Sequence, residues 1–420
     1  MEIMPDIPAT LEELAARVRA SAPAIARASA QQKLDALSLM AESLTRGADE
    51  ILAANQSDLA RARREGLAEG QIDRLGLDAG RISSMADGIL EVAALPDPIG
   101  EITSGYTLAN GLRVRKQRVP LGVVGIIYEN RPNVTSDAAA LCIKSGNAAF
   151  LRGSSAALGS NTAIAAHLGE ALAKAGLSRE SVTLVPDGSR ETATAFMKLS
   201  GYIDCLIPRG GISLIQAVRQ HATVPYIIDG EGNCHIYVDE SADLDAAGEI
   251  IVNAKVQRPS VCNSVETVLV HQSIAAEFLP MLDSRLSQVE LRGDPKVCET
   301  IVRAVAATER DYATEFLDLI LAVKVVEGLD EAISHIGTYG SGHSEAILTN
   351  DYSHASRFVS EVDAAAVLVN ASTRFVDGNQ LGLGAEIGIS TQKLHARGPM
   401  GLTALTTEKF IIEGTGQIRP

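Results

Sequence analysis

Short apolar runs that alternate with helical segments between residues 122 and 211 most constrain the fold of this chain. The runs are continuous and rich in Val, Ile and Leu, which is typical of strands buried on both faces of a parallel sheet. They lie at 122–128, 148–152, 182–185 and 203–208, with helices predicted at 136–145, 161–175 and 191–199. This alternation predicts βαβ units and a doubly wound α/β sheet.

The flanking sequence adds two kinds of segment. Residues 10–93 show the three-and-four spacing of buried helical stripes, whereas 102–119 and 406–413 read as extended chain, the first as an exposed hairpin that could pair with another subunit. A second α/β set follows Cys262. Its strands are expected near 265–270, 322–326, 345–348 and 366–369.

Composition narrows the class of protein. The 420 residues carry a net charge of −15, which argues against a nucleic-acid partner or an anionic membrane surface. No apolar run reaches the ~18 residues of a membrane helix, and the first residues lack a signal-peptide pattern. Five widely spread cysteines with no CxxC pair indicate a reducing cytoplasm, without a disulfide framework or a zinc site.

Cys262 is the candidate nucleophile. A cysteine taken alone is most often a buried structural residue. This one lies in the polar run Gln257–Ser264, before a β-branched strand at 265–271 and close to Arg258, which would favour the thiolate. The other four cysteines are interpreted as core or surface residues. His235, the neighbour of Cys234, is expected in a turn and with a structural role.

Glycine-rich segments offer two candidate phosphate sites. The run Gly382–Gly388 has the wrong spacing for a dinucleotide fingerprint and follows a loop, so a substrate-side loop is the simpler interpretation. Gly210 and Gly211, which follow Arg209 at a strand-to-helix junction, suit an anion better because glycine admits close approach at a helix N-terminus. Many βα turns use paired glycines only to turn, so this signal alone is weak.

Tyr128–Asn133 ends a buried strand with polar side chains and a proline. Ligands of open α/β sheets gather at the carboxyl ends of strands. Asn130 could donate an amide hydrogen bond to a developing oxyanion. The alternative is a proline turn followed by a capped helix.

These segments together resemble the gamma-glutamyl phosphate reductases, the proline-biosynthesis branch of the aldehyde dehydrogenase superfamily. The resemblance spans nearly the whole chain. The matching segments are Val119–Thr135, Lys144–Ala148, Asp229–His235 and the surroundings of Cys262.

The resemblance implies roles for individual residues. Cys262 matches the thiol nucleophile and Asn130 the oxyanion donor. Arg152 matches the position that contacts the adenosine ribose, where a guanidinium would suit a 2′-phosphate, and Gly188, Gly210 and Gly211 are the other cofactor-binding candidates. Arg131 and Arg258 are candidates for the substrate's phosphate or α-carboxylate. No metal site is implied.

One departure from the superfamily is informative. Hydrolytic aldehyde dehydrogenases carry a general-base glutamate in a Leu-Glu-Leu-Gly-Gly motif, but residues 227–232 hold no glutamate in register. A water-activating base would waste the acyl phosphate by hydrolysing the thioester.

The resemblance also implies an organisation. A Rossmann-type NADPH-binding domain is expected from 1–108 and 129–256, and an α/β catalytic domain from 257–370. An extended β oligomerisation flap is expected from 109–128 and 400–420. Residues 371–399 would return through a Gly-rich loop at the active site. A homodimer or larger homo-oligomer follows, and the pathway suggests glutamate 5-kinase as a partner.

The implied activity is the NADPH-dependent reduction of L-glutamyl 5-phosphate to L-glutamate 5-semialdehyde and phosphate through a cysteine thioester. This is the second step of proline biosynthesis from glutamate. Two alternatives remain open: another aldehyde or acyl-phosphate dehydrogenase of the superfamily, and an inactive nucleotide-binding or oligomeric paralogue.

Overall fold

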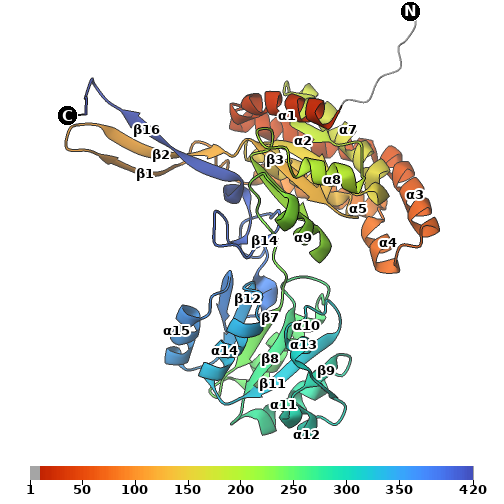
Figure 1. The fold of residues 1–420 in the computed structure, drawn as a ribbon, viewed down its shortest axis with the longest axis vertical. Helices are drawn as coiled ribbons and strands as arrows, with labels where there is room; N and C mark the ends of the chain where they lie inside the picture. The colour runs from red at the N-terminus through yellow and green to blue at the C-terminus, as the bar shows by residue number, and fades with distance from the viewer. Residues whose placement is uncertain (1–9, 420) are drawn as a thin grey trace, which may run out of the picture. The chain divides into compact units, whose positions relative to one another are not determined.

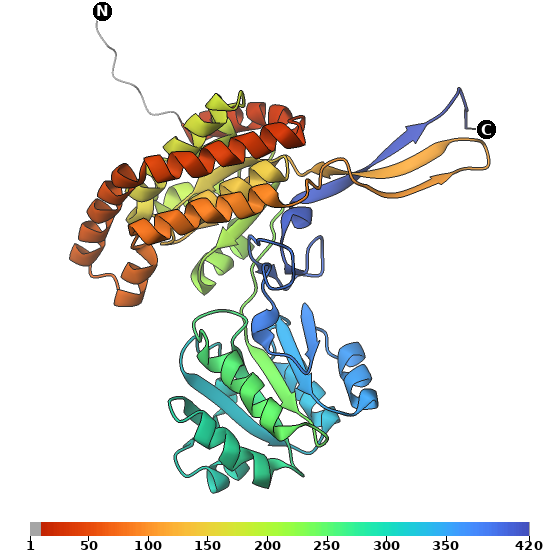
Figure 2. The same cartoon turned by 180° about the vertical axis from the view of Figure 1, so that it is seen from behind.

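The computed structural model describes residues 10–419, which form two compact units. Figures 1 and 2 show the ribbon from two opposite sides. The first unit contains the chain up to Ile228 together with Leu383–Gly388 and the segment from Met400 onward. The second contains Asp229–Gly382 and Ile389–Pro399.

The first unit is built on a parallel four-stranded sheet. The strand order is β5-β4-β3-β6. The chain therefore adds β4 and β5 on one side of β3 and then places β6 on the other side. The strands are β3 (Val123–Tyr128), β4 (Ala148–Arg152), β5 (Val182–Leu184) and β6 (Cys205–Arg209). The predicted doubly wound α/β fold is therefore confirmed for this segment.

Helices cover both faces of this sheet. Side chains of β3 and β4 pack on one face with α1, α8 and α9 in a single apolar cluster. Helices α6 and α7 pack against the sheet as well, with α2, α3 and α5 against them. The helices are α1 (Leu11–Ala26), α2 (Ala30–Arg46), α3 (Ala48–Arg64), α4 (Glu69–Leu75), α5 (Ala79–Ala94), α6 (Asn133–Lys144), α7 (Leu158–Lys174), α8 (Arg190–Phe196) and α9 (Ile212–His221).

An antiparallel three-stranded sheet extends from the same unit (Figure 1). Its order is β1-β2-β16, with β1 (Ile102–Thr107), β2 (Arg113–Pro120) and β16 (Thr406–Glu413). The extended segments expected at 102–119 and 406–413 are thus strands of one sheet. Strand β3, which the predicted flap range 109–128 includes, pairs in the four-stranded sheet instead. Its continuous apolar sequence suits a strand covered on both faces, and all six of its residues are buried, unlike those of β1 and β2.

The second unit is built on a seven-stranded parallel sheet of order β10-β9-β11-β8-β7-β12-β13. The strands are β7 (Cys234–Val238), β8 (Val265–His271), β9 (Glu290–Gly293), β10 (Val305–Ala306), β11 (Ile320–Val326), β12 (Ser344–Leu348) and β13 (Ala366–Val369). A short antiparallel pair, β14 (Ile389–Ser390) with β15 (Gly398–Pro399), belongs to the same unit.

Two apolar clusters hold helices on opposite faces of this sheet. One face packs against α10 and α11, and the other against α14 and α15. The helices of the unit are α10 (Leu244–Val256), α11 (Ala275–Arg285), α12 (Pro295–Thr300), α13 (Glu309–Tyr312), α14 (Leu329–Tyr339) and α15 (Tyr352–Glu361). The second predicted α/β set is confirmed.

One prediction in this unit was wrong. His235 was expected in a turn, but it lies in β7 and is fully buried. The glycines and acidic residues at 229–232 indicated a turn, and this turn ends two residues earlier than predicted because β7 already begins at Cys234. Strand β7 pairs with both β8 and β12, so tertiary pairing decided the conformation at His235.

Candidate active site

Cys262 lies in the loop between α10 and β8, at the amino edge of the second unit's sheet. The Ser264 amide donates to the Val261 carbonyl at 3.0 Å, which closes a turn around Cys262 and Asn263. The Ser264 hydroxyl donates to the Ala254 carbonyl at 3.1 Å and ties this turn to α10. The Cys262 side chain is partly exposed.

The Cys262 backbone is held from the side of β7. The Cys234 thiol donates to the Cys262 carbonyl at 3.2 Å. A Cβ atom at Gly232 would overlap this carbonyl and the adjoining backbone, so no larger residue fits there without displacing Cys262. The Gly232 amide in turn donates to the Glu315 carboxylate at 2.8 Å. Sequence reasoning did not find Glu315, which lies far from Gly232 along the chain.

Asn263 anchors the turn from the other side. Its Nδ2 donates to the Val376 carbonyl at 2.8 Å, and its own carbonyl accepts from Thr373 Oγ1 at 2.7 Å. Its Oδ1 accepts from Arg374 Nη1. Thr373 and Arg374 belong to a short 3₁₀ helix, η3 (Thr373–Phe375). The nucleophile candidate therefore sits on a peptide whose neighbours are fixed on both sides.

The other cysteines differ from Cys262 in burial. Burial raises the pKa of the Cys205 thiol to about 12 and raises those of Cys142 and Cys234 well above the ordinary value. Cys298 is partly exposed, but its thiol donates to the Gly293 carbonyl at 3.4 Å. These features leave Cys262 as the best candidate for a reactive thiol among the described residues.

Arg374 places a cation beside the turn. Besides its contact with Asn263, its Nε donates to Gln257 Oε1 at 2.9 Å. Burial lowers the pKa of the Arg374 guanidinium, and Arg258 lowers it further, whereas Asp377 and the Cys262 thiolate oppose this. Arg258 is exposed and lies within electrostatic reach of Arg374. Arg374 was missed because nothing in its local sequence marks it. Only folding brings residue 374 next to residue 263.

In the first unit, Asn130 lies just beyond the carboxyl end of β3. Its Oδ1 accepts a hydrogen bond from Ser154 Oγ at 2.7 Å. Ser154 follows β4, so this contact links the ends of two adjacent strands. The hydrogen bond fixes the amide orientation, with Nδ2 on the side away from Ser154.

Arg152 is the last residue of β4 and is largely buried. Its guanidinium donates to the Ser189 carbonyl, and its Nε has no partner among residues 10–419. Burial lowers its pKa, against the opposing effects of Asp187 and Tyr128. Gly188 packs so closely on the Ser155 backbone that a Cβ there would overlap it. The ends of β4 and β5 are thereby held together.

Gly210 and Gly211 follow β6 and precede α9. The Gly211 amide donates to the Glu129 carboxylate at 2.9 Å, and a Cβ at Gly210 would lie 2.7 Å from that carboxylate. An anion therefore already sits at the first turn of α9, as expected where unpaired amides and the helix dipole favour negative charge. Asn130, Arg152 and these glycines all gather at the carboxyl edge of the four-stranded sheet, beside the strand where its order reverses.

Arg131 is exposed and directly follows Asn130. Thus the structure brings Cys262 and Arg258 together in the second unit. The other predicted site residues are in the first unit, where Asn130, Arg152, Gly188 and the Gly210–Gly211 pair share one edge.

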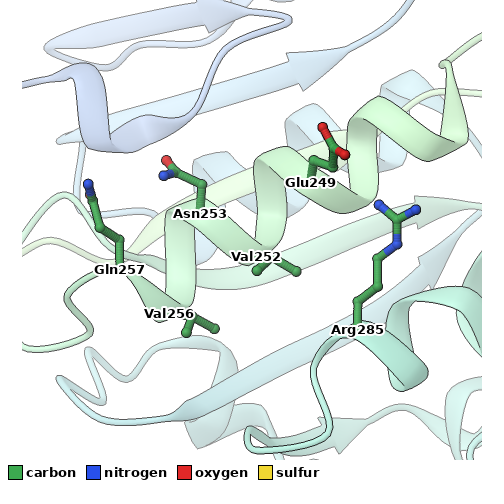
Figure 3. Close-up of a pocket in the computed structure, with 6 residues that line it drawn as sticks. All are labelled: Glu249, Val252, Asn253, Val256, Gln257 and Arg285. Carbon is green, nitrogen blue, oxygen red and sulfur yellow. The ribbon is translucent and has the colours of Figure 1, made fainter.

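A separate depression of about 520 Å³ runs along α10 (Figure 3). It is lined by Glu249, Val252, Asn253, Val256, Gln257 and Arg285. Its walls carry no cysteine or histidine. It touches the candidate site only through Gln257, which contacts Arg374.

A search with protein-family models matches residues 7–310 to the aldehyde dehydrogenase family. The chain belongs to this family. It is 56% identical over 394 residues to gamma-glutamyl phosphate reductase of Caldanaerobacter subterraneus, covering 93% of this chain and 94% of that one. It is 53% identical to the enzyme of the same name from Thermobifida fusca, covering 99% and 100%.

Solved structures agree on the fold. The crystal structure of gamma-glutamyl phosphate reductase from Thermotoga maritima superposes with a TM-score of 0.96 at 49% identity, covering 98% of this chain and all of that one. An acetylating aldehyde dehydrogenase from Geobacillus thermoglucosidasius superposes with a TM-score of 0.70 at 18% identity, over 97% of each chain. The second likeness concerns the fold alone.

No helix in residues 10–419 is long and apolar enough to cross a bilayer. No group of three or more His, Cys, Asp or Glu side chains there could hold a metal ion.

Proposed function

We propose that this chain reduces L-glutamyl 5-phosphate to L-glutamate 5-semialdehyde and phosphate, with NADPH, in the cytoplasm. The observation that carries the chemistry is the anchored turn that holds the partly exposed Cys262 and that Arg374 contacts through Asn263. The substrate assignment is supported by near-full-length identity above 50% to relatives that are named for this reaction.

Cys262 is the nucleophile of this proposal. Its thiolate attacks the acyl carbon, the C–S bond forms, and the bond to the phosphate oxygen breaks. Phosphate is a good leaving group, so the step needs little general-acid help, and the thioester divides one hard reduction into two easier steps. The Cys262 amide serves as a donor to the oxyanion, and one such donor is typically worth ~3 kcal/mol. Asn130 keeps the oxyanion-donor role that the family resemblance implies.

The residues at the carboxyl edge of the first unit's sheet suit a dinucleotide phosphate. Arg152 is cationic and has a buried Nε without a partner among the described residues. The glycines at 188, 210 and 211 permit close backbone approach. The Gly211 amide already binds a carboxylate, which the pyrophosphate would displace. NADPH held by Arg152 and these glycines would supply a hydride for reduction of the thioester, which would free the aldehyde and the Cys262 thiolate.

The substrate's anionic groups require cations near the thiol. Arg258 is in the same unit as Cys262, and Arg131 follows Asn130 in the first unit. We assign both to binding the substrate's phosphate or α-carboxylate. The absence of an in-register glutamate at 227–232 fits an enzyme whose thioester awaits hydride rather than water.

The three-stranded β1-β2-β16 sheet is our candidate for a homo-oligomer interface. Tyr106, Val114 and Ile412 are in register across its three strands, so they share one face. Phe410 joins them there, with Lys116 Nζ 5.2 Å from its ring centre. On the opposite face, Arg113 and Arg115 pair with Glu413. The first face, which we call the apolar face, gathers the exposed apolar side chains around a single Lys116–Glu408 ion pair, so it suits association better than the charged face. Glutamate 5-kinase remains a candidate partner on pathway grounds alone.

The decisive experiment is phosphate-dependent reduction of NADP by glutamate 5-semialdehyde, the reverse reaction, with wild type and Cys262→Ala. Turnover should require phosphate and should disappear in the variant while thermal unfolding is unchanged. Turnover without phosphate would indicate a hydrolytic dehydrogenase. Turnover retained by Cys262→Ala would contradict the nucleophile assignment, and no turnover by either protein would favour an inactive paralogue.

A further inference from the structure

Arg374 reaches the nucleophile's turn from a part of the chain more than a hundred residues away. Two side-chain amide oxygens accept hydrogen bonds from its guanidinium: Gln257 Oε1 accepts from Nε at 2.9 Å, and Asn263 Oδ1 accepts from Nη1. These contacts use two of the five N–H donors that a guanidinium carries. Asn263 is the residue directly after Cys262, so the cation is fixed against the turn that carries the thiol.

We propose that Arg374 binds the phosphoryl group of the substrate, both as the leaving phosphate and as the inorganic phosphate that enters in the reverse reaction. This inference rests on the proposed function, because it takes Cys262 as the attacking group.

Reach favours the phosphate over the α-carboxylate. In L-glutamyl 5-phosphate a single oxygen joins phosphorus to the carbon that the thiolate attacks, whereas three carbon atoms separate that carbon from the α-carboxylate. A cation held against the residue next to Cys262 is therefore near the phosphoryl group when sulfur is near the acyl carbon. Guanidinium also matches a tetrahedral oxyanion with paired donors.

Charge supports the same assignment. Asp377, Arg258 and the Cys262 thiolate all act electrostatically on Arg374, so two cations, one carboxylate and the reacting sulfur are within electrostatic reach of one another. Asp377 offsets part of the repulsion between the two cations, and an incoming phosphate dianion adds further favourable charge to the pair.

The test is the phosphate dependence of semialdehyde oxidation in Arg374→Gln and Arg374→Lys. We expect the KM for phosphate to rise about 10- to 100-fold in Arg374→Gln, as for loss of a charge-assisted hydrogen bond, with a smaller rise in Arg374→Lys. The KM for the semialdehyde should change less than about threefold. Arsenate, which has the same shape and charge, should show the same loss.

A second readout does not require turnover. Phosphate should slow alkylation of Cys262 by iodoacetamide in the wild type, in the presence of NADP, and this protection should require higher phosphate in Arg374→Gln. Arg357→Gln is the charge-matched control, since Arg357 is an exposed residue of α15 that pairs with Asp330 and Glu361. It should leave both readouts unchanged.

Thr373→Val separates binding from loop positioning. This change removes the 2.7 Å hydrogen bond to the Asn263 carbonyl and leaves the cation in place. We expect a lower kcat with an unchanged KM for phosphate. An equal rise in both KM values in Arg374→Gln, or an unchanged phosphate KM, would overturn the proposal and leave Arg374 a positioning residue. If Cys262 were not the nucleophile, a separate result would show it, because Cys262→Ala would retain activity.

Discussion

At the residue scale, the packing of Gly232 against the Cys262 backbone gives the sharpest test of how the thiol is positioned. The overlap that a Cβ would make there is with backbone atoms, which cannot rotate away as a side-chain tip can. Gly232→Ala must therefore displace the turn that carries Cys262. We expect kcat of the phosphate-dependent reaction to fall about 100-fold, because small misplacements of reacting groups are costly.

The matched control is Gly337→Ala. Gly337 lies on the exposed side of α14 with no atom within 4 Å of an added Cβ, and alanine favours a helix by ~1 kcal/mol over glycine. Its kcat should not change. Thermal unfolding should show that Gly232→Ala remains folded. Normal turnover in that variant would mean that the loop adjusts at little cost.

Single residues also mark what the sequence could and could not predict. Cys262 and Asn130 became candidates from the sequence because each lies in a polar segment next to a buried strand. Arg374 and Glu315 were not, because each acts on a residue more than 80 positions away. The periodicities that predict strands and helices contain no information on such contacts.

At the element scale, a buried ion pair joins α10 to β8 beneath the Cys262 loop. Lys255 Nζ lies 2.6 Å from Glu266 Oε2, and both side chains are fully buried. Burial raises the pKa of Glu266 to about 7 and lowers that of Lys255. Lys255→Met removes the partner that offsets this burial, so we expect a loss of ~3–5 kcal/mol in the free energy of unfolding.

The double variant Lys255→Met with Glu266→Gln removes both charges and keeps an acceptor for the Leu317 amide, which donates to Glu266 Oε1 at 3.2 Å. Urea unfolding should show the double variant recovering at least about half of the loss. If the double variant is less stable than Lys255→Met, the pair does not act through uncompensated charge.

A buried histidine on α14 makes the stability of the protein depend on pH. His335 packs against Tyr312, Tyr339 and His235, and burial lowers its pKa to about 3. The unfolded chain binds a proton near pH 6.5, which the folded protein does not accept until pH 3. The contribution of neutral His335 to the free energy of unfolding is therefore fully present above pH 6.5. It falls as the pH drops below that value, by up to ~1.4 kcal/mol per pH unit.

His335→Leu should reduce that slope without loss of stability at pH 7.5, because neither ring nitrogen of His335 has a partner among residues 10–419. Urea unfolding of both proteins at pH 7.5, 6.0 and 5.0 measures how the free energy of unfolding changes with pH. A slope equal to that of the wild type would mean that His335 titrates normally in the folded protein.

The elements themselves were largely predictable, for a physical reason. Strands such as β3 and β8 are buried along their length and carry continuous β-branched runs, and the helices between them keep their periodicity. The exceptions included β7 and the short β9 and β10. Strand β7 begins directly after a glycine-rich turn, and β9 and β10 have only four and two residues. Their conformation comes from pairing with neighbours rather than from local sequence.

At the scale of the whole molecule, a net charge of −15 disfavours association of two copies unless a surface offsets the repulsion. The apolar face of the β1-β2-β16 sheet offers such a surface. Tyr106, Phe410 and Ile412 on this face are 55%, 60% and 60% exposed. Exposed apolar side chains concentrated on one face typically mark an interface.

We therefore expect the wild type to sediment as a homo-oligomer and Phe410→Asp to shift it toward the monomer, because the carboxylate would be desolvated in the interface. Ile411→Asp is the matched control. It adds the same charge on the opposite face, where Arg115 is its cross-strand neighbour, and should leave the assembly intact. Sedimentation velocity across a range of protein concentrations distinguishes the three proteins. Equal dissociation of both variants would point to general weakening of the sheet, and a monomeric wild type would remove the assignment of this face to self-association.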